Sequence, residues 1–327
     1  MKIIGSYVSP YVRKVLACLA LKGLDYEIDP ITPFYGNDAF ERLSPLRRIP
    51  VLVDGDLTLC DSSVICAYLD EAYPKRPLLP ESAADRARAR WLEEYADTRL
   101  GDVFIWGLFY PRFVHPIVWG EPGDQGRIAK TLGEDLPREL DWLEGELPAS
   151  GFLFGERIGL ADIAVASFFR NGAHIGIGID PTRWPRTAAF VDRALADPCL
   201  AELLPFEQVQ LGHSPAGRRA ALLAAGAPLT ADTMATREPR RGVMRLCVPQ
   251  ACASSNLSVL RSGTPSKKQS RQRRNGDPPP ASSNRVMEER SFIASTGPNM
   301  ASGERSRWAL TVSVHSRSRG PRIGWAR

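Results

Sequence analysis

Residues 2–72 carry, in order, the patterns of a strand, a helix, a strand, a hairpin and a second helix, and this order strongly constrains the fold. Residues 2–7 and 26–28 read as short strands on either side of a helix that begins at Ser9-Pro10. Serine caps helices and proline suits their first turn. Apolar residues then repeat at helical spacing as far as Leu19. A strand–helix–strand unit implies two parallel strands joined by a right-handed crossover.

The second half of this region reads as a hairpin followed by a helix. Asp54-Gly55 is a turn dipeptide between the apolar runs 50–53 and 57–59. A helical pattern follows Asp61-Ser62 and stops before Pro74. We therefore predict a small mixed sheet with helices, a thioredoxin-like α/β domain, in residues 1–80.

Residues 81–211 read as an all-α second domain. Helical patterns cover residues 84–118, 126–147, 160–177 and 184–196, and Pro111 is expected to break the first of them. Apart from residues 152–154, no strand pattern interrupts this stretch.

The charge of the chain changes sign after Leu211. Residues 1–212 contain 22 Lys and Arg against 31 Asp and Glu, a net charge of −9, whereas the rest contains 20 against 6, a net charge of +14. Beyond an Ala-rich stretch at 216–231, Pro, Ser, Gly and Arg follow without apolar period, which is typical of chains that cannot form a core. We predict that residues 212–327 are a basic extension that is disordered or does not belong to the natural reading frame.

Several classes of protein are disfavoured by composition. No apolar run approaches the ~18 residues of a membrane span, and charged residues come too early for a secretory signal. Arginine clusters in the extension would suit phosphates, but no nucleic-acid-binding motif accompanies them, so we expect no nucleic-acid partner. The six cysteines form no C-x-x-C pair, so no metal site is predicted. Cys18, Cys60, Cys66 and Cys199 stand in apolar surroundings and are expected to be reduced core thiols. We expect a cytoplasmic protein.

Four segments occur together in register: Ser9–Val15, Arg48–Leu52, Asp61-Ser62 and Gly155–Ile163. Over residues 1–210 the chain resembles the cytosolic glutathione transferase superfamily, in particular serine-type members such as the tau class and bacterial relatives. The resemblance implies glutathione as co-substrate, no metal, and a homodimer. In the Gly155–Ile163 segment the family usually has Ser or Thr where Gly159 stands, three residues before Asp162.

Ser9 is the predicted catalytic residue. Because the four histidines stand at 115, 174, 213 and 315, Ser9 has no nearby base in its own domain and is not expected to act as a nucleophile. Its hydroxyl can instead donate a hydrogen bond to the glutathione sulfur and hold it as thiolate. The alternative is that Ser9 only caps the helix. Ser6, Tyr7 and Tyr11 are reserve donors, with Tyr7 ranked second, and Arg13 is expected to be structural.

The resemblance also implies a glutathione-binding set. Ile49 precedes a proline that is cis in the family, Pro50, and its backbone would pair with the cysteinyl unit. Asp61 and Ser62, at a helix start, would hold the γ-glutamyl group, since helix N-termini bind anions. Arg48 would contact the glycine carboxylate. Each of these residues also has a purely structural alternative. Pro50 could start an edge strand, Asp61 and Ser62 could only cap the helix, and Arg48 could be a solvated surface charge.

The electrophile pocket is expected between Ser9 and the first long helices of the second domain. Its predicted lining is aromatic: Tyr11, Trp106, Tyr110 and Phe113. An aromatic stripe at helical spacing can equally belong to a core.

The predicted function is a glutathione transferase that adds the glutathione sulfur to a small hydrophobic electrophile, as in detoxification. A thiol reductase is disfavoured, because serine cannot form a mixed disulfide. A zeta-type isomerase is disfavoured because its Ser-Ser-Cys run is missing. A non-catalytic binding module of the same fold remains open.

Overall fold

The computed structural model describes residues 1–241. Its sheet has four strands in the order β2-β1-β3-β4. The strands are β1 (Lys2–Ile4), β2 (Glu27–Asp29), β3 (Val51–Asp54) and β4 (Leu57–Cys60). β1 runs parallel to β2, while β1–β3 and β3–β4 are antiparallel. The predicted parallel pair and hairpin of a thioredoxin-like domain are thus confirmed.

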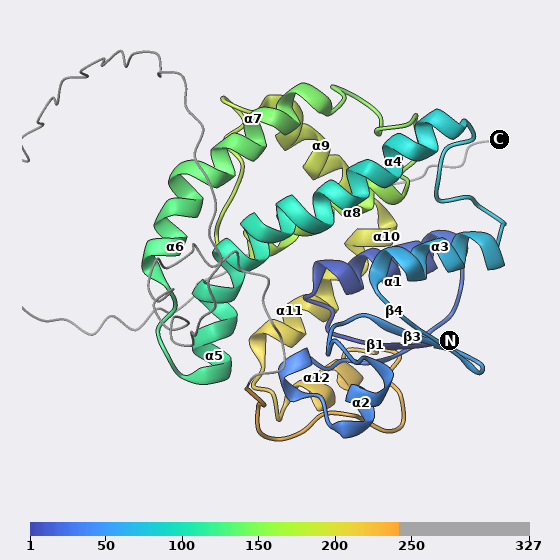
Figure 1. Cartoon of the computed structure of the whole chain (residues 1–327), viewed down its shortest axis with the longest axis vertical. Coiled ribbons are helices and arrows are strands. Elements are labelled where there is room, and N and C mark those ends of the chain that lie inside the picture. The colour runs from blue at the N-terminus through green and yellow to red at the C-terminus, as the bar shows by residue number, and fades with distance from the viewer. Residues whose placement is uncertain (242–327) are drawn as a thin grey trace, which may run out of the picture. The chain divides into compact units, whose positions relative to one another are not determined.

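Two helices cover one face of this sheet. α1 (Pro10–Lys22) begins at Ser9, whose hydroxyl accepts a hydrogen bond from the Val12 amide at 3.4 Å. It ends at Gly23, which has the left-handed φ of 66° that glycine adopts without strain. α3 (Ser62–Ala72) packs beside it. Figure 1 shows α1 and α3 on one side of the sheet and α2 (Asp38–Leu43) on the other.

A long helical stretch opens the second part and passes through Pro111. It comprises α4 (Ala83–Tyr95), η2 (Ala96–Val114) and α5 (His115–Trp119). The predicted break at Pro111 is wrong. η2 has the wider π-type turn, in which the amide of His115 bonds to the carbonyl of Tyr110, and this altered pitch accommodates the proline.

The predicted helical segments 126–147, 160–177 and 184–196 agree with α6 (Gln125–Lys130), η3 (Thr131–Asp135), α7 (Leu136–Glu146), α8 (Leu160–His174) and α9 (Pro185–Ala196). Two helices that were not predicted follow, α10 (Pro198–Ala201) and α11 (Leu204–Gly212), and α12 (Arg218–Ala224) lies in the Ala-rich stretch 216–231.

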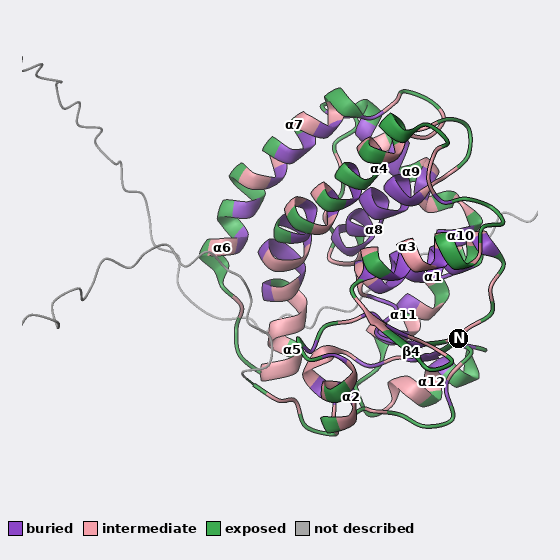
Figure 2. Cartoon of the chain, turned by 45° about the vertical axis from the view of Figure 1, so that its right-hand side comes forward, coloured by how far each residue is buried: buried purple, intermediate pink, exposed green. Residues whose placement is uncertain are grey.

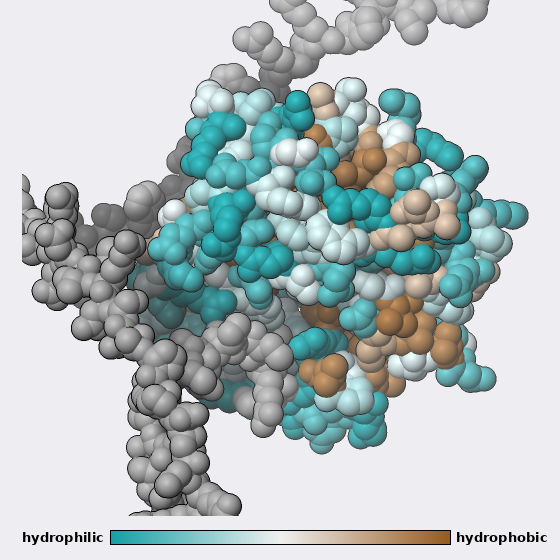
Figure 3. Space-filling view, turned by 45° about the horizontal axis from the view of Figure 1, so that its top comes forward, coloured by the Kyte–Doolittle hydropathy of each residue, from teal (hydrophilic) through white to brown (hydrophobic). Residues whose placement is uncertain are grey.

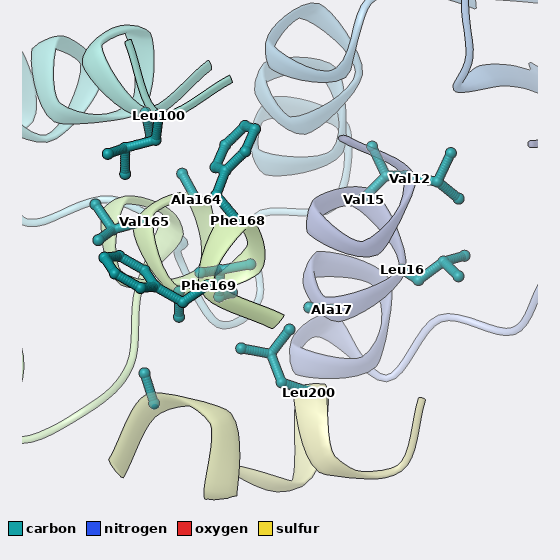
Figure 4. Close-up of a cluster of buried hydrophobic side chains, with 14 of the residues drawn as sticks. Val12, Val15, Leu16, Ala17, Leu100, Ala164, Val165, Phe168, Phe169 and Leu200 are labelled. Carbon is teal, nitrogen blue, oxygen red and sulfur yellow. The ribbon is translucent and has the colours of Figure 1, made fainter. Parts of the chain in front are cut away.

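α8 is the centre of the hydrophobic core. Its residues from Leu160 to Gly172 are all buried, and Figure 2 shows it enclosed by more exposed helices. Side chains of α1, η2, α8 and α10 meet around Phe168 and Phe169 (Figure 4). Because α8 contacts both α1 and η2, it fixes the thioredoxin-like part against the helical part.

A buried ion cluster lies in the same contact. Arg13 on α1 and Glu207 on α11 are both fully buried, and the Arg13 Nε donates to Glu207 Oε1 at 2.8 Å. His174 lies 2.6 Å and Arg170 3.8 Å from the same carboxylate. Burial alone would raise the pKa of Glu207, but Arg13 and His174 outweigh it and hold the pKa at about 2. Arg13 thus has a structural position, as expected from the sequence.

The helix-capping segment before α8 explains its unusual glycine. Asp162 accepts hydrogen bonds from the amides of Gly159 and Leu153, each at 2.8 Å. A Cβ on Gly159 would lie 3.1 Å from the carbonyl oxygen of Leu78. That oxygen accepts the Leu160 amide at 3.0 Å, so the glycine leaves room for a contact between the two parts of the fold.

Asp162 gives a first testable prediction. Burial raises its pKa from 3.8 to about 6, so its ionisation is less favourable in the folded chain than in the unfolded one. The stabilisation by protonated Asp162 is therefore complete below about pH 4 and is lost as the pH rises through 6. The free energy of unfolding should fall by up to about 3 kcal/mol over this range. Urea denaturation of the wild type between pH 4 and 7 measures this. In Asp162→Asn the free energy of unfolding should depend less on pH between pH 4 and 7. An equal pH dependence in both proteins would contradict the raised pKa of Asp162.

The ordered part of the chain extends beyond the boundary predicted at residue 211. Ile28 on β2 donates its amide to Pro228 at 2.8 Å and accepts that of Thr230 at 3.1 Å. The carboxylate of Asp29 accepts the Met234 amide at 2.6 Å. For residues 212–241 the prediction of a disordered extension is wrong, because their binding to the open edge of β2 uses backbone groups and needs no apolar period. The rest of the predicted extension, residues 242–327, lies outside the described residues.

Within residues 1–241 no helix is both long and apolar enough to cross a membrane. In the same residues no group of His, Cys, Asp and Glu is arranged to hold a metal ion. Figure 3 shows one face of the molecule as largely hydrophilic, with hydrophobic residues gathered on part of it.

Candidate functional site

A cleft of about 860 Å³ lies where the loops of the sheet meet η2 and α5. The segment after β1, η1 (Pro33–Tyr35), the loop before β3 and the start of α3 supply one wall. All of the predicted site residues except Pro50 line it, namely Ser9, Tyr11, Arg48, Ile49, Asp61, Ser62, Trp106, Tyr110 and Phe113. The fold thus brings together residues that are up to about a hundred positions apart.

Ser9 lies at the first turn of α1, on the wall of the cleft. The backbone before it is held by side chains from the helical part. Asn171 on α8 donates to the Val8 carbonyl at 2.9 Å, and Gln210 on α11 accepts the Tyr7 amide at 2.9 Å. Both side chains are almost fully buried and both line the cleft. Asn171 and Gln210 are not predicted as site residues, because no local sequence pattern links them to Ser9.

The reserve donors differ in their access to the cleft. Tyr7 is fully buried, packs on Phe206 with ring centroids 5.1 Å apart, and does not line the cleft. Burial raises the pKa of its hydroxyl. Ser6 does line the cleft, and so does Tyr11, whose hydroxyl donates to the carbonyl of Asp97 at 3.0 Å. Of the predicted donors, Ser9 is the one that both lines the cleft and caps the start of a helix, where a hydroxyl and the helix N-terminus could act on the same anion.

The Ile49–Pro50 peptide bond is cis, as the family resemblance implied. Ile49 lines the cleft, whereas Pro50 is buried outside its lining. Arg47 and Arg48, the two residues before Ile49, differ in burial. Arg47 is buried and pairs with Glu41 at 2.5 Å, while Arg48 is exposed and lines the cleft.

The start of α3 forms another part of the wall. The Asp61 carboxylate accepts the amides of Ser63 and Val64 at 2.9 and 3.3 Å, and its φ of 81° is one that non-glycine residues rarely adopt. Ser62, the first residue of the helix, lines the cleft with 3% of its surface exposed. Helix N-termini present amide hydrogens and a partial positive charge, so this end suits an anionic group.

A buried charge cluster supports this end of the cleft. Lys14 on α1 lies 2.5 Å from Asp97 and 2.8 Å from Glu93. Its ammonium group also donates to the hydroxyl of Ser63 at 3.1 Å. Lys14 therefore ties α1, α3 and the long helical stretch together around the cleft.

Aromatic side chains form another wall of the cleft. Trp106, Tyr110 and Phe113 on η2 are half-buried and line the cleft rather than a closed core. Phe34 of η1, which was not predicted, packs with its ring centroid 6.0 Å from that of Tyr110 and 5.7 Å from that of Trp119. This aromatic wall suits an apolar group bound in the same cleft as Ser9.

Comparison with known protein families matches two regions of the chain. Residues 3–77 match the family model for the glutathione S-transferase N-terminal domain. Residues 128–193 match the model for the glutathione S-transferase C-terminal domain. These regions hold most of the sheet side of the cleft and the core helix α8.

Individual relatives give the same picture. Glutathione S-transferase U13 of Arabidopsis thaliana is 32% identical over 173 residues, which cover 51% of this chain and 71% of the relative. Maleylacetoacetate isomerase of Pseudomonas aeruginosa is 29% identical over 217 residues, 64% of this chain and 97% of the relative. A crystal structure of a glutathione S-transferase from Rhodospirillum rubrum has a TM-score of 0.59 at 26% identity and covers 67% of this chain and 98% of its own.

Proposed function

The chain belongs to the glutathione S-transferase family, and from this membership we propose that it binds glutathione in the cleft, holds the sulfur as thiolate through Ser9, and adds it to an electrophilic carbon. The observation that supports this most is that Ser9, Ile49 and Ser62 line the same cleft as the aromatic side chains of η2. Conjugation of a halonitrobenzene, followed by absorbance, tests the proposal directly.

The energetics of this step suit a single hydroxyl. A free thiol has a pKa of about 8.5, so only a few per cent is ionised at neutral pH. Lowering that pKa by about two units requires about 2.7 kcal/mol. One hydrogen bond to a charged acceptor contributes about 1.5–3 kcal/mol, and the start of α1 adds about 0.3–1 kcal/mol. The Ser9 hydroxyl can accept the Val12 amide and still donate its proton to the sulfur.

The other parts of the tripeptide have matching groups. The backbone of Ile49 would pair with the cysteinyl unit as an added strand does. The first turn of α3, with Ser62 and Asp61, would hold the γ-glutamyl group, and Arg48 the glycine carboxylate. When the thiolate attacks a halonitrobenzene, a carbon–sulfur bond forms and the carbon–halogen bond breaks, with the halide leaving.

Arg48 gives a second prediction. Because its side chain is exposed, its attraction to the glycine carboxylate is screened. Arg48→Gln should raise the KM for glutathione about twofold to fivefold at low salt, leave kcat nearly unchanged, and show a smaller effect at high salt. Arg42→Gln, an exposed arginine that does not line the cleft, is the control. An unchanged KM in Arg48→Gln at low salt would remove Arg48 from the site.

An isomerase is the second candidate, because the Pseudomonas aeruginosa relative is named a maleylacetoacetate isomerase. An isomerisation that starts from the same thiolate would return glutathione unchanged. Glutathione consumption measured beside product formation therefore separates the two reactions. Retention on immobilised glutathione with no turnover of any tested substrate would favour a non-catalytic binding module instead.

We further propose a cytoplasmic homodimer with a role in detoxification. The homodimer is proposed from the family membership, and exposed apolar side chains such as Val64 on α3 (50% exposed) and Leu57 on β4 (38% exposed) would be covered if that interface includes them. Sedimentation velocity would determine the oligomeric state.

A further inference from the structure

The carboxy-terminal segment, residues 213–241, contributes to the cleft. It follows both regions that match the family models, yet Pro215 and Arg218 line the cleft wall. Its attachment to β2 and to Asp29 is made by short backbone and side-chain hydrogen bonds. The place of Arg218 is therefore set by the folded segment.

Arg218 is a half-buried cation on this wall. Its Nε donates to the carbonyl of His213 at 3.0 Å. Among residues 1–241 no carboxylate lies within ion-pair distance of it, whereas its neighbour Arg219 lies 3.6 Å from Asp29. A partly desolvated guanidinium without an anion is unfavourable, so the position suits an anionic ligand.

Two carboxylates of the cleft, Asp97 and Asp102, lie near other cations. Asp97 pairs with Lys14. Burial raises the pKa of Asp102, and the nearby cations that oppose this are Arg99 and Arg127 rather than Arg218. Burial lowers the pKa of Arg218. The titratable group beside it is the Tyr35 hydroxyl, which is neutral near pH 7 because burial raises its pKa.

We propose that Arg218 is a carboxylate-binding subsite of the cleft. A guanidinium presents two parallel N–H groups that match a carboxylate in a bidentate geometry. Two sources of this group fit the cleft: the glycine end of glutathione, or an acidic second substrate whose apolar body lies against the aromatic wall. The inference rests on the proposed function, because it places a substrate in the same cleft.

The test compares Arg218→Gln with the wild type on two second substrates, a chloronitrobenzoate and the matching neutral chloronitrobenzamide. With glutathione saturating, the KM for the benzoate should rise about tenfold while that for the amide changes less than twofold, if the second substrate supplies the carboxylate. If glutathione supplies it, the KM for glutathione should rise about tenfold with either substrate. Arg237→Gln, which removes an exposed arginine of the same segment, should match the wild type.

A binding measurement separates this inference from the proposed function. If the wild type conjugates neither substrate, the proposed function fails, but calorimetric Kd values for glutathione and for the chloronitrobenzoate still test Arg218. Arg218→Lys, which keeps the charge but loses the bidentate fork, should fall between wild type and Arg218→Gln, and it replaces the glutamine variant if that variant does not fold. Values of KM and Kd within twofold of wild type in both variants, for both compounds, would overturn the subsite.

Discussion

Replacing Ser9 with alanine is expected to lower kcat/KM for conjugation about tenfold to a hundredfold at neutral pH. The variant loses one hydrogen bond to a charged sulfur, worth about 1.5–3 kcal/mol, and each 1.4 kcal/mol changes a rate about tenfold. With glutathione saturating, the apparent pKa in the pH dependence of kcat/KM for the electrophile should rise by about one to two units towards that of an unbound thiol. A stopped-flow pH series of the wild type and the variant measures both effects.

Folding should be nearly unaffected by this change. The cap lost at the start of α1 is a long hydrogen bond of 3.4 Å, so the free energy of unfolding should fall by only about 1 kcal/mol. Ser9→Thr keeps a hydroxyl and should retain most of the activity. If Ser9→Ala stayed close to wild type while Tyr7→Phe abolished conjugation, Ser9 would not be the donor and the fully buried Tyr7 would have to be.

Replacing Glu207 with leucine is expected to lower the free energy of unfolding by about 3–5 kcal/mol, the largest stability effect that we expect. Glu207 is fully buried, compensates the charges of Arg13 and Arg170, and is hydrogen-bonded to His174. Its removal leaves buried positive charge without a partner, which costs far more than the ion pair contributes when both partners are present. Urea denaturation at neutral pH measures the loss.

Two comparisons make this result specific to the buried cluster. Arg13→Met combined with Glu207→Leu should recover part of the stability lost in Glu207→Leu, because the double variant removes the unpaired charge. Glu146→Gln breaks a surface pair with Arg88 and should cost about 1 kcal/mol or less. A Glu207→Leu protein as stable as Glu146→Gln would contradict the role of the cluster.

Most of the fold follows from local patterns. The turn at Asp54-Gly55, the caps at Ser9 and Asp61, and the apolar period of α1 and α8 each depend on neighbouring residues, so they are readable from the sequence. Pro111 was misread because the usual rule assumes an α-helix, and η2 has a wider turn. The ordering of residues 212–241 was missed because it depends on an unpaired strand edge elsewhere in the chain.

The site residues that could be predicted are those in segments that resemble the glutathione transferase family. Ser9, Ile49 and Ser62 stand in short segments of characteristic sequence, and the structure places all three on the cleft. Asn171, Gln210 and Arg218 reach the same cleft from α8, α11 and α12, and their positions depend on how whole helices pack. Their contribution could be seen only from tertiary structure.

The attachment of residues 228–236 along β2 has a consequence for the handling of this protein. An uncovered outer strand offers its amides and carbonyls to any extended peptide, including the same strand of another molecule, and so promotes aggregation. In this fold the chain itself occupies that position, through Ile28 and Asp29. A shortened protein that ends at residue 211 would lose this protection together with Pro215 and Arg218 of the cleft lining. Poor solubility after truncation would therefore reflect an exposed strand and not a failure of the transferase fold.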